Sequence, residues 1–126
     1  MPPKPETAIQ HAVMEYLFYE SKHKPLFYWR ANNLPVPITN NNRVTGFRPV
    51  GVKGVPDLNL IYGGLYIGWE IKTATGKQSE DQKSVQSLIE RAGGIYHLIR
   101  SVDDAQARLK EIYTSYPLPA PLDDNN

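Results

Sequence analysis

The chain contains no cysteine among its 126 residues. This absence excludes a disulfide framework and a thiolate zinc site, so any metal ion must be held by oxygen or imidazole ligands. The three histidines, His11, His23 and His97, show no metal-ligand spacing, and we expect them to be structural or surface residues. Carboxylates are therefore the metal ligands to look for.

Long apolar runs are also missing. No run approaches the roughly 20 residues that span a bilayer, and residues 1–8 lack the basic and apolar regions of a signal peptide. With 40% hydrophobic and 21% charged residues, the composition is that of an ordinary soluble protein. We expect a cytoplasmic protein with no membrane partner. Its length predicts a single domain, over 1–116. The three prolines and the DDNN end after Tyr116 predict a disordered tail over 117–126.

The sequence also lacks a strong charge imbalance, since its formal net charge is only +1. A strongly basic balance that would indicate a nucleic-acid partner is missing. Locally, however, the segment 30–53 has four basic residues and no acidic one: Arg30, Arg43, Arg48 and Lys53. These four are candidate phosphate contacts, and the alternative is a set of solvated surface cations.

Hydrophobic periodicity predicts the order helix, strand, hairpin, helix, strand, helix. A polar stretch over 32–45, with two prolines and three consecutive asparagines, predicts a mobile loop. The predicted elements are a helix from near Pro5 that stops before Pro25, a strand over 26–31, hairpin strands over 58–62 and 65–73, a helix after the capping pair Ser79 and Gln82 and before Gly93-Gly94, a strand over 95–100, and a helix that begins at Ser101. This order predicts an α/β fold with a mixed sheet.

The Gly63-Gly64 turn fixes the register of the predicted hairpin. Counting outward from a two-residue turn places Asp57 directly opposite Glu70. Because side chains alternate between the two faces of a strand, these carboxylates share one face with Lys72, while the other face is wholly apolar. A slip of one residue would destroy this sorting, so the pattern itself specifies the register.

Two like charges directly opposite each other on a sheet destabilise it by up to about 1 kcal/mol, and a bound cation is the simplest compensation. Mg²⁺ is usually held by one or two carboxylates together with water and phosphate oxygens. Asp57 and Glu70 therefore form a candidate metal-binding site, with Lys72 close enough to orient water or stabilise a transition state. The alternative is a surface acidic pair that forms salt bridges with Lys72 or Lys53.

A resemblance to a known family extends this pattern. Pro56-Asp57, then a hairpin, then Glu70-Ile71-Lys72 resembles the PD-(D/E)XK signature of restriction-endonuclease-like nucleases. The chain is similar to their VRR-NUC family over about residues 5 to 113. The further motifs that carry the likeness are Arg30-Ala31-Asn32, the glycine-flanked segment 51–57, the segment 68–72, Gly76 with Gln78 and Gln82, and Gly93-Gly94-Ile95-Tyr96.

The resemblance implies a restriction-endonuclease-like core of α-β-β-β-α-β order, here with an additional C-terminal helix. It implies one or two Mg²⁺ or Mn²⁺ ions and no nucleotide cofactor. Asp57 and Glu70 would be metal ligands, the backbone carbonyl of Ile71 would complete the ligand set, and Lys72 would be the catalytic lysine. Glu6 corresponds to the family's helical acidic residue, which helps hold the metal or its waters; alternatively, it is a carboxylate stabilised by the helix dipole.

Two further residues have competing interpretations. Gln82 interrupts an apolar helix face, as expected of a side chain that reaches the site, but it also fits the third position of a capping box with Ser79. Trp69 could stack on a base together with Tyr66, but it falls on the apolar face and is expected in the core.

The resemblance implies a DNA endonuclease linked to phage replication or DNA repair, which we expect in the cytoplasm of a bacterial or phage-infected cell. We expect a homodimer that acts on branched DNA, as a Holliday-junction resolvase does. The alternatives are a flap or single-strand-specific nuclease, a non-catalytic DNA-binding domain with a nuclease fold, and a different hydrolase or structural phage protein in which the carboxylates form a surface ion network.

Overall fold

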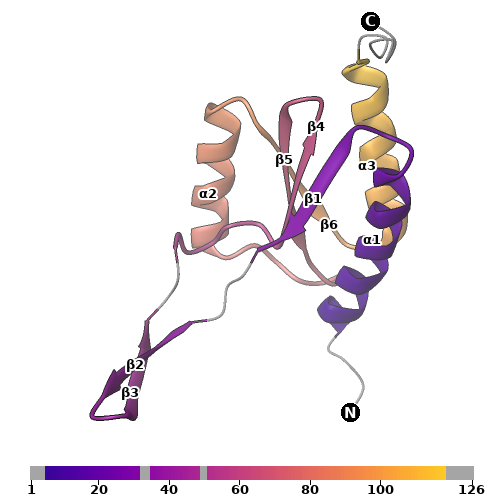
Figure 1. Ribbon diagram of the computed structural model, residues 1–126. Coiled ribbons are helices and arrows are strands. Elements are labelled where there is room, and N and C mark those ends of the chain that lie inside the picture. The colour runs from indigo at the N-terminus through magenta and orange to yellow at the C-terminus, as the bar shows by residue number, and fades with distance from the viewer. Residues whose placement is uncertain (1–4, 32–34, 49–50, 119–126) are drawn as a thin grey trace, which may run out of the picture.

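The computed structural model describes residues 5–31, 35–48 and 51–118. Its main element is a mixed sheet of four strands in the order β1-β4-β5-β6 (Figure 1). The strands are β1 (Leu26–Arg30), β4 (Leu58–Tyr62), β5 (Leu65–Ile71) and β6 (Ile95–Ile99). The pairings β1 with β4 and β4 with β5 are antiparallel, and β6 joins β5 in parallel. The predicted α/β class with a mixed sheet is confirmed.

Helices cover both faces of this sheet. Figure 1 shows α1 (Pro5–Ser21) and α3 (Val102–Ser115) together on one side and α2 (Glu80–Arg91) on the other. The core lies between the sheet and the α1/α3 layer, and Val13, Leu17 and Leu109 from these helices are fully buried against it. The strands contribute the apolar face that the sequence predicted: Leu58, Leu60, Tyr62, Ile67, Trp69 and Ile71.

The helix starts follow the predicted capping signals. Ser79 accepts a hydrogen bond from the Gln82 backbone N–H, and the Gln82 side chain accepts one from the Ser79 N–H, which completes a capping box at the start of α2. Ser101 caps α3 by accepting from the Asp104 N–H. These caps fix where α2 begins and hence where Gln82 lies.

The predicted loop over 32–45 is wrong for residues 36–45. There the chain forms β2 (Val36–Asn40) and β3 (Arg43–Arg48), a separate antiparallel hairpin that stands apart from the main sheet in Figure 1. Asn41 and Asn42 have φ angles of 54° and 63°, the left-handed conformation that a tight two-residue hairpin turn requires. The asparagine run is therefore a turn between strands, not a sign of irregular structure.

The β4–β5 register is the predicted one. Tyr62 pairs with Leu65, Leu60 with Ile67, and Leu58 with Trp69, so the next pair outward is Asp57 with Glu70. Pro56 is fully buried, and its ring lies over Gly68 of β5, where a Cβ atom would come within 2.7 Å of the Pro56 Cγ. Glycine at position 68 thus lets the segment before β4 lie close to β5.

No helix in the described parts of the chain is both long and apolar enough to cross a bilayer. The predicted disordered tail falls almost wholly on residues 119–126, which lie outside the described residues.

Candidate metal centre

Asp57 is fixed at the start of β4 by contacts to both neighbouring strands. Its backbone carbonyl accepts a hydrogen bond from the Ala31 N–H at 2.9 Å, and its carboxylate Oδ2 accepts one from the Ile71 N–H at 2.9 Å. The N–H and C=O groups of a strand residue point to the same side. The Ile71 carbonyl, the predicted backbone ligand, therefore lies on the side of β5 that faces Asp57.

Glu70 is the one buried charged residue of the described chain, with only 3% of its surface exposed. Its Oε1 accepts a hydrogen bond of 2.7 Å from the Gln82 amide, whereas its buried Oε2 has no partner among the described residues. Burial, and then the adjacent Asp57 carboxylate, raise the pKa of Glu70 to about 8. Such an orphaned carboxylate oxygen beside a second carboxylate is suited to bind a cation.

Gln82 fulfils both of its proposed roles at once. Its side-chain oxygen closes the capping box at the Ser79 N–H, and its side-chain nitrogen donates to Glu70. The two roles are compatible, because the amide oxygen makes one of these hydrogen bonds and the amide nitrogen makes the other. The cap therefore fixes the donor that holds Glu70.

Lys72 lies on the Glu70 face just beyond the end of β5 and is partly exposed. Its charge opposes the rise in the Glu70 pKa, so the ammonium lies within electrostatic reach of the pair. No salt bridge joins Lys72 to either carboxylate in the parts of the chain that the structure describes, and Lys53 instead pairs with Asp81 at 3.5 Å. The alternative of an acidic pair neutralised by these two lysines is therefore not what the geometry shows.

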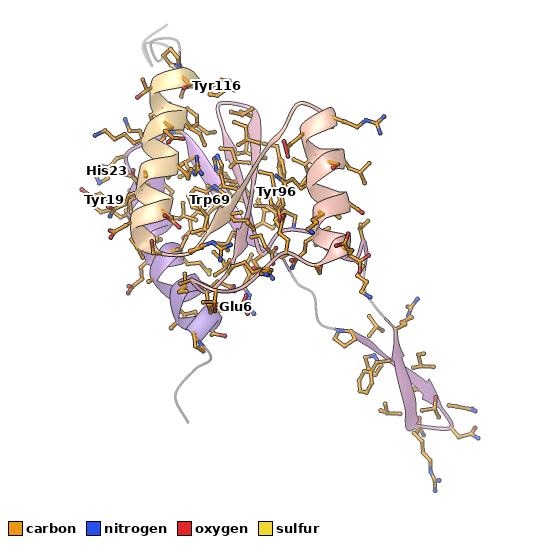
Figure 2. All side chains as sticks on the ribbon, turned by 180° about the vertical axis from the view of Figure 1, so that it is seen from behind. Glu6, Tyr19, His23, Trp69, Tyr96 and Tyr116 are labelled. Atoms are coloured by element: carbon orange, nitrogen blue, oxygen red, sulfur yellow. The ribbon has the colours of Figure 1, made fainter. Side chains whose placement is uncertain are left out.

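Two polar side chains on the Glu70 side of the sheet, Tyr96 and Gln78, were not predicted from the sequence to belong to the site. Tyr96 pairs with Gly68 across β5 and β6, so it shares the site face, and its hydroxyl accepts a hydrogen bond of 3.2 Å from Gln78. Burial, with a contribution from Glu70, raises the Tyr96 pKa to about 12, which keeps the hydroxyl protonated at neutral pH. Figure 2 shows Tyr96 on the α2 side and Trp69 on the opposite side of the sheet. The alternation of side chains between the two faces of β6 could have identified Tyr96 from the sequence.

Trp69 belongs to the core, as expected. It is fully buried, and its indole N–H donates to His97 Nδ1 at 3.1 Å. This contact also explains His97 as a structural histidine.

The structure does not bring every predicted site residue close to Asp57 and Glu70. Glu6 is exposed in the first turn of α1 (Figure 2), and among the described residues no group of three or more acidic, histidine or cysteine side chains is arranged to hold a metal. Arg30 pairs with Leu58, which places it on the face opposite Asp57. Arg43 and Arg48 are exposed on β3, away from the carboxylates.

Two carboxylates nevertheless suffice for one ion of the predicted kind. Mg²⁺ and Mn²⁺ prefer oxygen ligands, and Mg²⁺ commonly keeps several waters while it binds one or two carboxylates. Asp57, Glu70 and the Ile71 carbonyl offer such a set, and the partnerless Glu70 Oε2 is the observation that fits it. The residues present therefore suit the metal that the sequence implied.

No protein-family model matches the chain, and no curated protein matches it. Any family assignment therefore depends on the motifs and the geometry described above.

The burial of Glu70 predicts a characteristic pH dependence of stability in the absence of metal. The unfolded glutamate loses its proton at about pH 4.3, whereas the folded one keeps it up to about pH 8. Between these values the unfolded state binds fewer protons, so the free energy of unfolding should fall as pH rises. Glu70→Gln should remove this fall and be more stable than the wild type at pH 9 by about 1 to 3 kcal/mol.

Urea unfolding in EDTA at pH 5, 7 and 9 measures the effect. Glu90→Gln, which alters an exposed glutamate of α2, is the matched control and should follow the wild type. A Glu70→Gln protein that is less stable than the wild type at pH 9 would contradict the electrostatic account of the site.

Proposed function

We propose that this protein is a Mg²⁺- or Mn²⁺-dependent DNA endonuclease of the VRR-NUC type with a restriction-endonuclease-like core. The observation that carries the proposal is the buried Glu70 carboxylate, whose free oxygen lies beside Asp57 with no neutralising partner among the described residues. A fold retains such a like-charge arrangement at a cost in stability, and a functional cation is its simplest explanation.

The order of elements supports the fold assignment. When the β2–β3 hairpin is set aside as an insertion, the chain reads α1, β1, β4, β5, α2, β6, followed by α3. This is the α-β-β-β-α-β order that the resemblance implies, with one further helix. The two carboxylates lie at the start of β4 and near the end of β5, on the face that α2 covers in part.

Each residue of the site has a distinct task in this proposal. Asp57, Glu70 and the Ile71 carbonyl would hold the metal ion, which when bound supplies a Lewis acid for phosphodiester hydrolysis. The Ile71 N–H and the Gln82 amide fix the orientation of the two carboxylates. Lys72, with no ion pair among the described residues, is placed to hold an attacking water and to stabilise negative charge on the phosphate.

The four basic residues of the 30–53 segment differ in how well they are suited to contact DNA phosphates in this proposal. Arg43 and Arg48 lie on the exposed β2–β3 hairpin, a segment without acidic residues that is suited to phosphate contacts. Lys53 forms a salt bridge with Asp81 of α2, although the Lys53 side chain is 80% exposed. Arg30 starts from the other face of the sheet and is the weakest of the four candidates.

The second candidate function is a non-catalytic DNA-binding domain with the same fold. It would require the basic hairpin but not a buried glutamate beside a second carboxylate. The buried Glu70 carboxylate destabilises the folded protein and adds no positive charge that could bind DNA. The geometry therefore favours the enzyme.

The enzyme proposal predicts that activity depends on the two carboxylates. Asp57→Asn and Glu70→Gln should each reduce Mn²⁺-dependent cleavage of DNA at least ~100-fold while the protein stays folded, because each removes a metal ligand. Lys72→Ala should impair turnover more than Mn²⁺ binding, since the lysine is not a ligand. Cleavage assays paired with calorimetric Mn²⁺ titrations measure both quantities.

Glu15→Gln, an exposed carboxylate on α1, is the control and should cleave like the wild type. Wild-type rates from either carboxylate variant would refute the site, and loss of the metal site in Lys72→Ala would refute the role of the lysine.

We further propose that the enzyme acts as a homodimer on four-way junctions. One chain offers one pair of metal-binding carboxylates, whereas resolving a junction requires paired cuts related by two-fold symmetry, which a cyclic dimer supplies. The exposed aromatics on α1, Phe18 and Tyr19, lie over one face of the sheet, whereas Phe27 points from the other face. Phe18 and Tyr19 therefore form one candidate dimer surface, and Phe27 belongs to a different face.

Light scattering should give twice the chain mass of 14.3 kDa, and a mobile four-way junction should be cut in paired strands faster than a flap or a linear duplex. A monomer that cuts flaps and leaves junctions intact would overturn the dimer proposal and leave the metal site in place.

A further inference from the structure

Two exposed aromatic rings lie on the same face of the sheet as the candidate metal centre. Phe27 and Trp29 of β1 have 65% and 40% of their surfaces exposed, and their ring centroids are 5.6 Å apart at an angle of 34°. Burial alternates along β1, with Leu26 and Tyr28 packed toward α1 and the core. Phe27 and Trp29 therefore project from the opposite face.

The strand register places this pair next to the carboxylates. Phe27 lies opposite Ile61 and Trp29 opposite Asn59, which is two residues from Asp57 on the same face of β4. The diagonal from Trp29 to Asp57 is about 8 Å between Cα atoms. At about 3.4 Å per stacked base, that span corresponds to two or three nucleotides.

The helix layer on this face leaves the pair uncovered. α2 packs against β6, at the far edge of the sheet from β1. Ile61, opposite Phe27, is also exposed at 37% of its surface. An exposed apolar surface thus begins at Trp29 and continues to Phe27 and Ile61, away from the metal centre.

The segment of the chain that contains this surface carries basic residues but no acidic ones. From position 25 to position 56 the chain has no acidic residue. On the other side of Asp57, Lys72 forms no salt bridge in the described parts of the chain. Exposed aromatic rings in a segment that carries basic and no acidic side chains are a combination by which proteins bind single-stranded nucleic acid, and the acidic side chains next to the rings, Asp57 and Glu70, are the proposed metal ligands.

We propose that Phe27 and Trp29 form a stacking platform for unpaired bases of single-stranded DNA next to the phosphodiester that is cleaved. The inference rests on the proposed nuclease function and narrows its substrate to DNA with unpaired nucleotides beside the cleavage position. Flaps supply such nucleotides, as does a branch point at which base pairs open, and a continuous duplex does not. The platform would thus select for DNA structure without reading sequence, because every base has a stacking face.

The two tryptophans of the chain make the test direct, because Trp29 is exposed and Trp69 is fully buried. In EDTA, a twelve-residue oligodeoxythymidylate should quench the Trp29 emission of the wild type. Trp29→Leu should lose this response and keep the emission of Trp69, which reports that the core is intact. Fluorescence anisotropy of the labelled oligonucleotide should show about 10-fold weaker binding for Trp29→Leu and for Phe27→Leu, within the range expected for loss of one stacked base.

Tyr116→Leu is the matched control, since Tyr116 is 48% exposed at the end of α3, which lies over the other face. It should bind like the wild type, and a twelve-base-pair duplex should bind all four proteins within about 2-fold. Equal oligonucleotide affinity in the wild type and both β1 variants, or no binding at all, would overturn the platform. A concentration-dependent shift of Trp29 emission without DNA, together with a doubled mass, would assign the surface to self-association and overturn it too.

These measurements need no metal and no cleavage. Failure of the nuclease proposal would appear as binding without metal-dependent hydrolysis, whereas failure of the platform would leave hydrolysis intact.

Discussion

The repulsion between Asp57 and Glu70 is the constraint on which the rest of the site depends. Strand pairing places the two carboxylates opposite each other, and burial leaves Glu70 with one oxygen that contacts no donor among the described residues. In the absence of a cation, burial of the carboxylate, and then repulsion from Asp57, raise the pKa of Glu70 to about 8, so Glu70 is protonated at neutral pH. A bound divalent ion would replace that proton, so binding and protonation compete for the same oxygens.

The surrounding structure holds the pair in position. Pro56 packs over Gly68 immediately before Asp57, and Gly54 has a φ angle of 91° that lets the preceding loop lie against the Asp81 backbone at the start of α2. The capping box at that same helix start orients the Gln82 amide toward Glu70. The loop before β4, the end of β5 and the start of α2 thus meet at one point, and a shift of any one of them would separate the carboxylates.

Much of this arrangement could be predicted from the sequence, because strict alternation around a Gly-Gly turn permits only one hairpin register. The capping signal likewise predicted the start of α2. The β2–β3 hairpin was missed because three asparagines indicate a loop by composition, whereas two of them supply positive φ angles for a turn. Alternation along β1 and β6 would have placed Arg30 away from the site and Trp29 and Tyr96 beside it. The position of Glu6 depends on how α1 packs, which local pattern does not specify.

The central claim is that Asp57 and Glu70 bind a divalent cation in place of a proton. It is tested most directly by calorimetric titration of Mn²⁺ at pH 7 in two buffers that differ in ionisation enthalpy, which yields the number of protons released per ion. The account predicts a site with one ion per chain that releases close to one proton at pH 7 and far fewer at pH 9, where Glu70 is already ionised. Mn²⁺ binding without proton release at pH 7, or no binding at either pH, would contradict it.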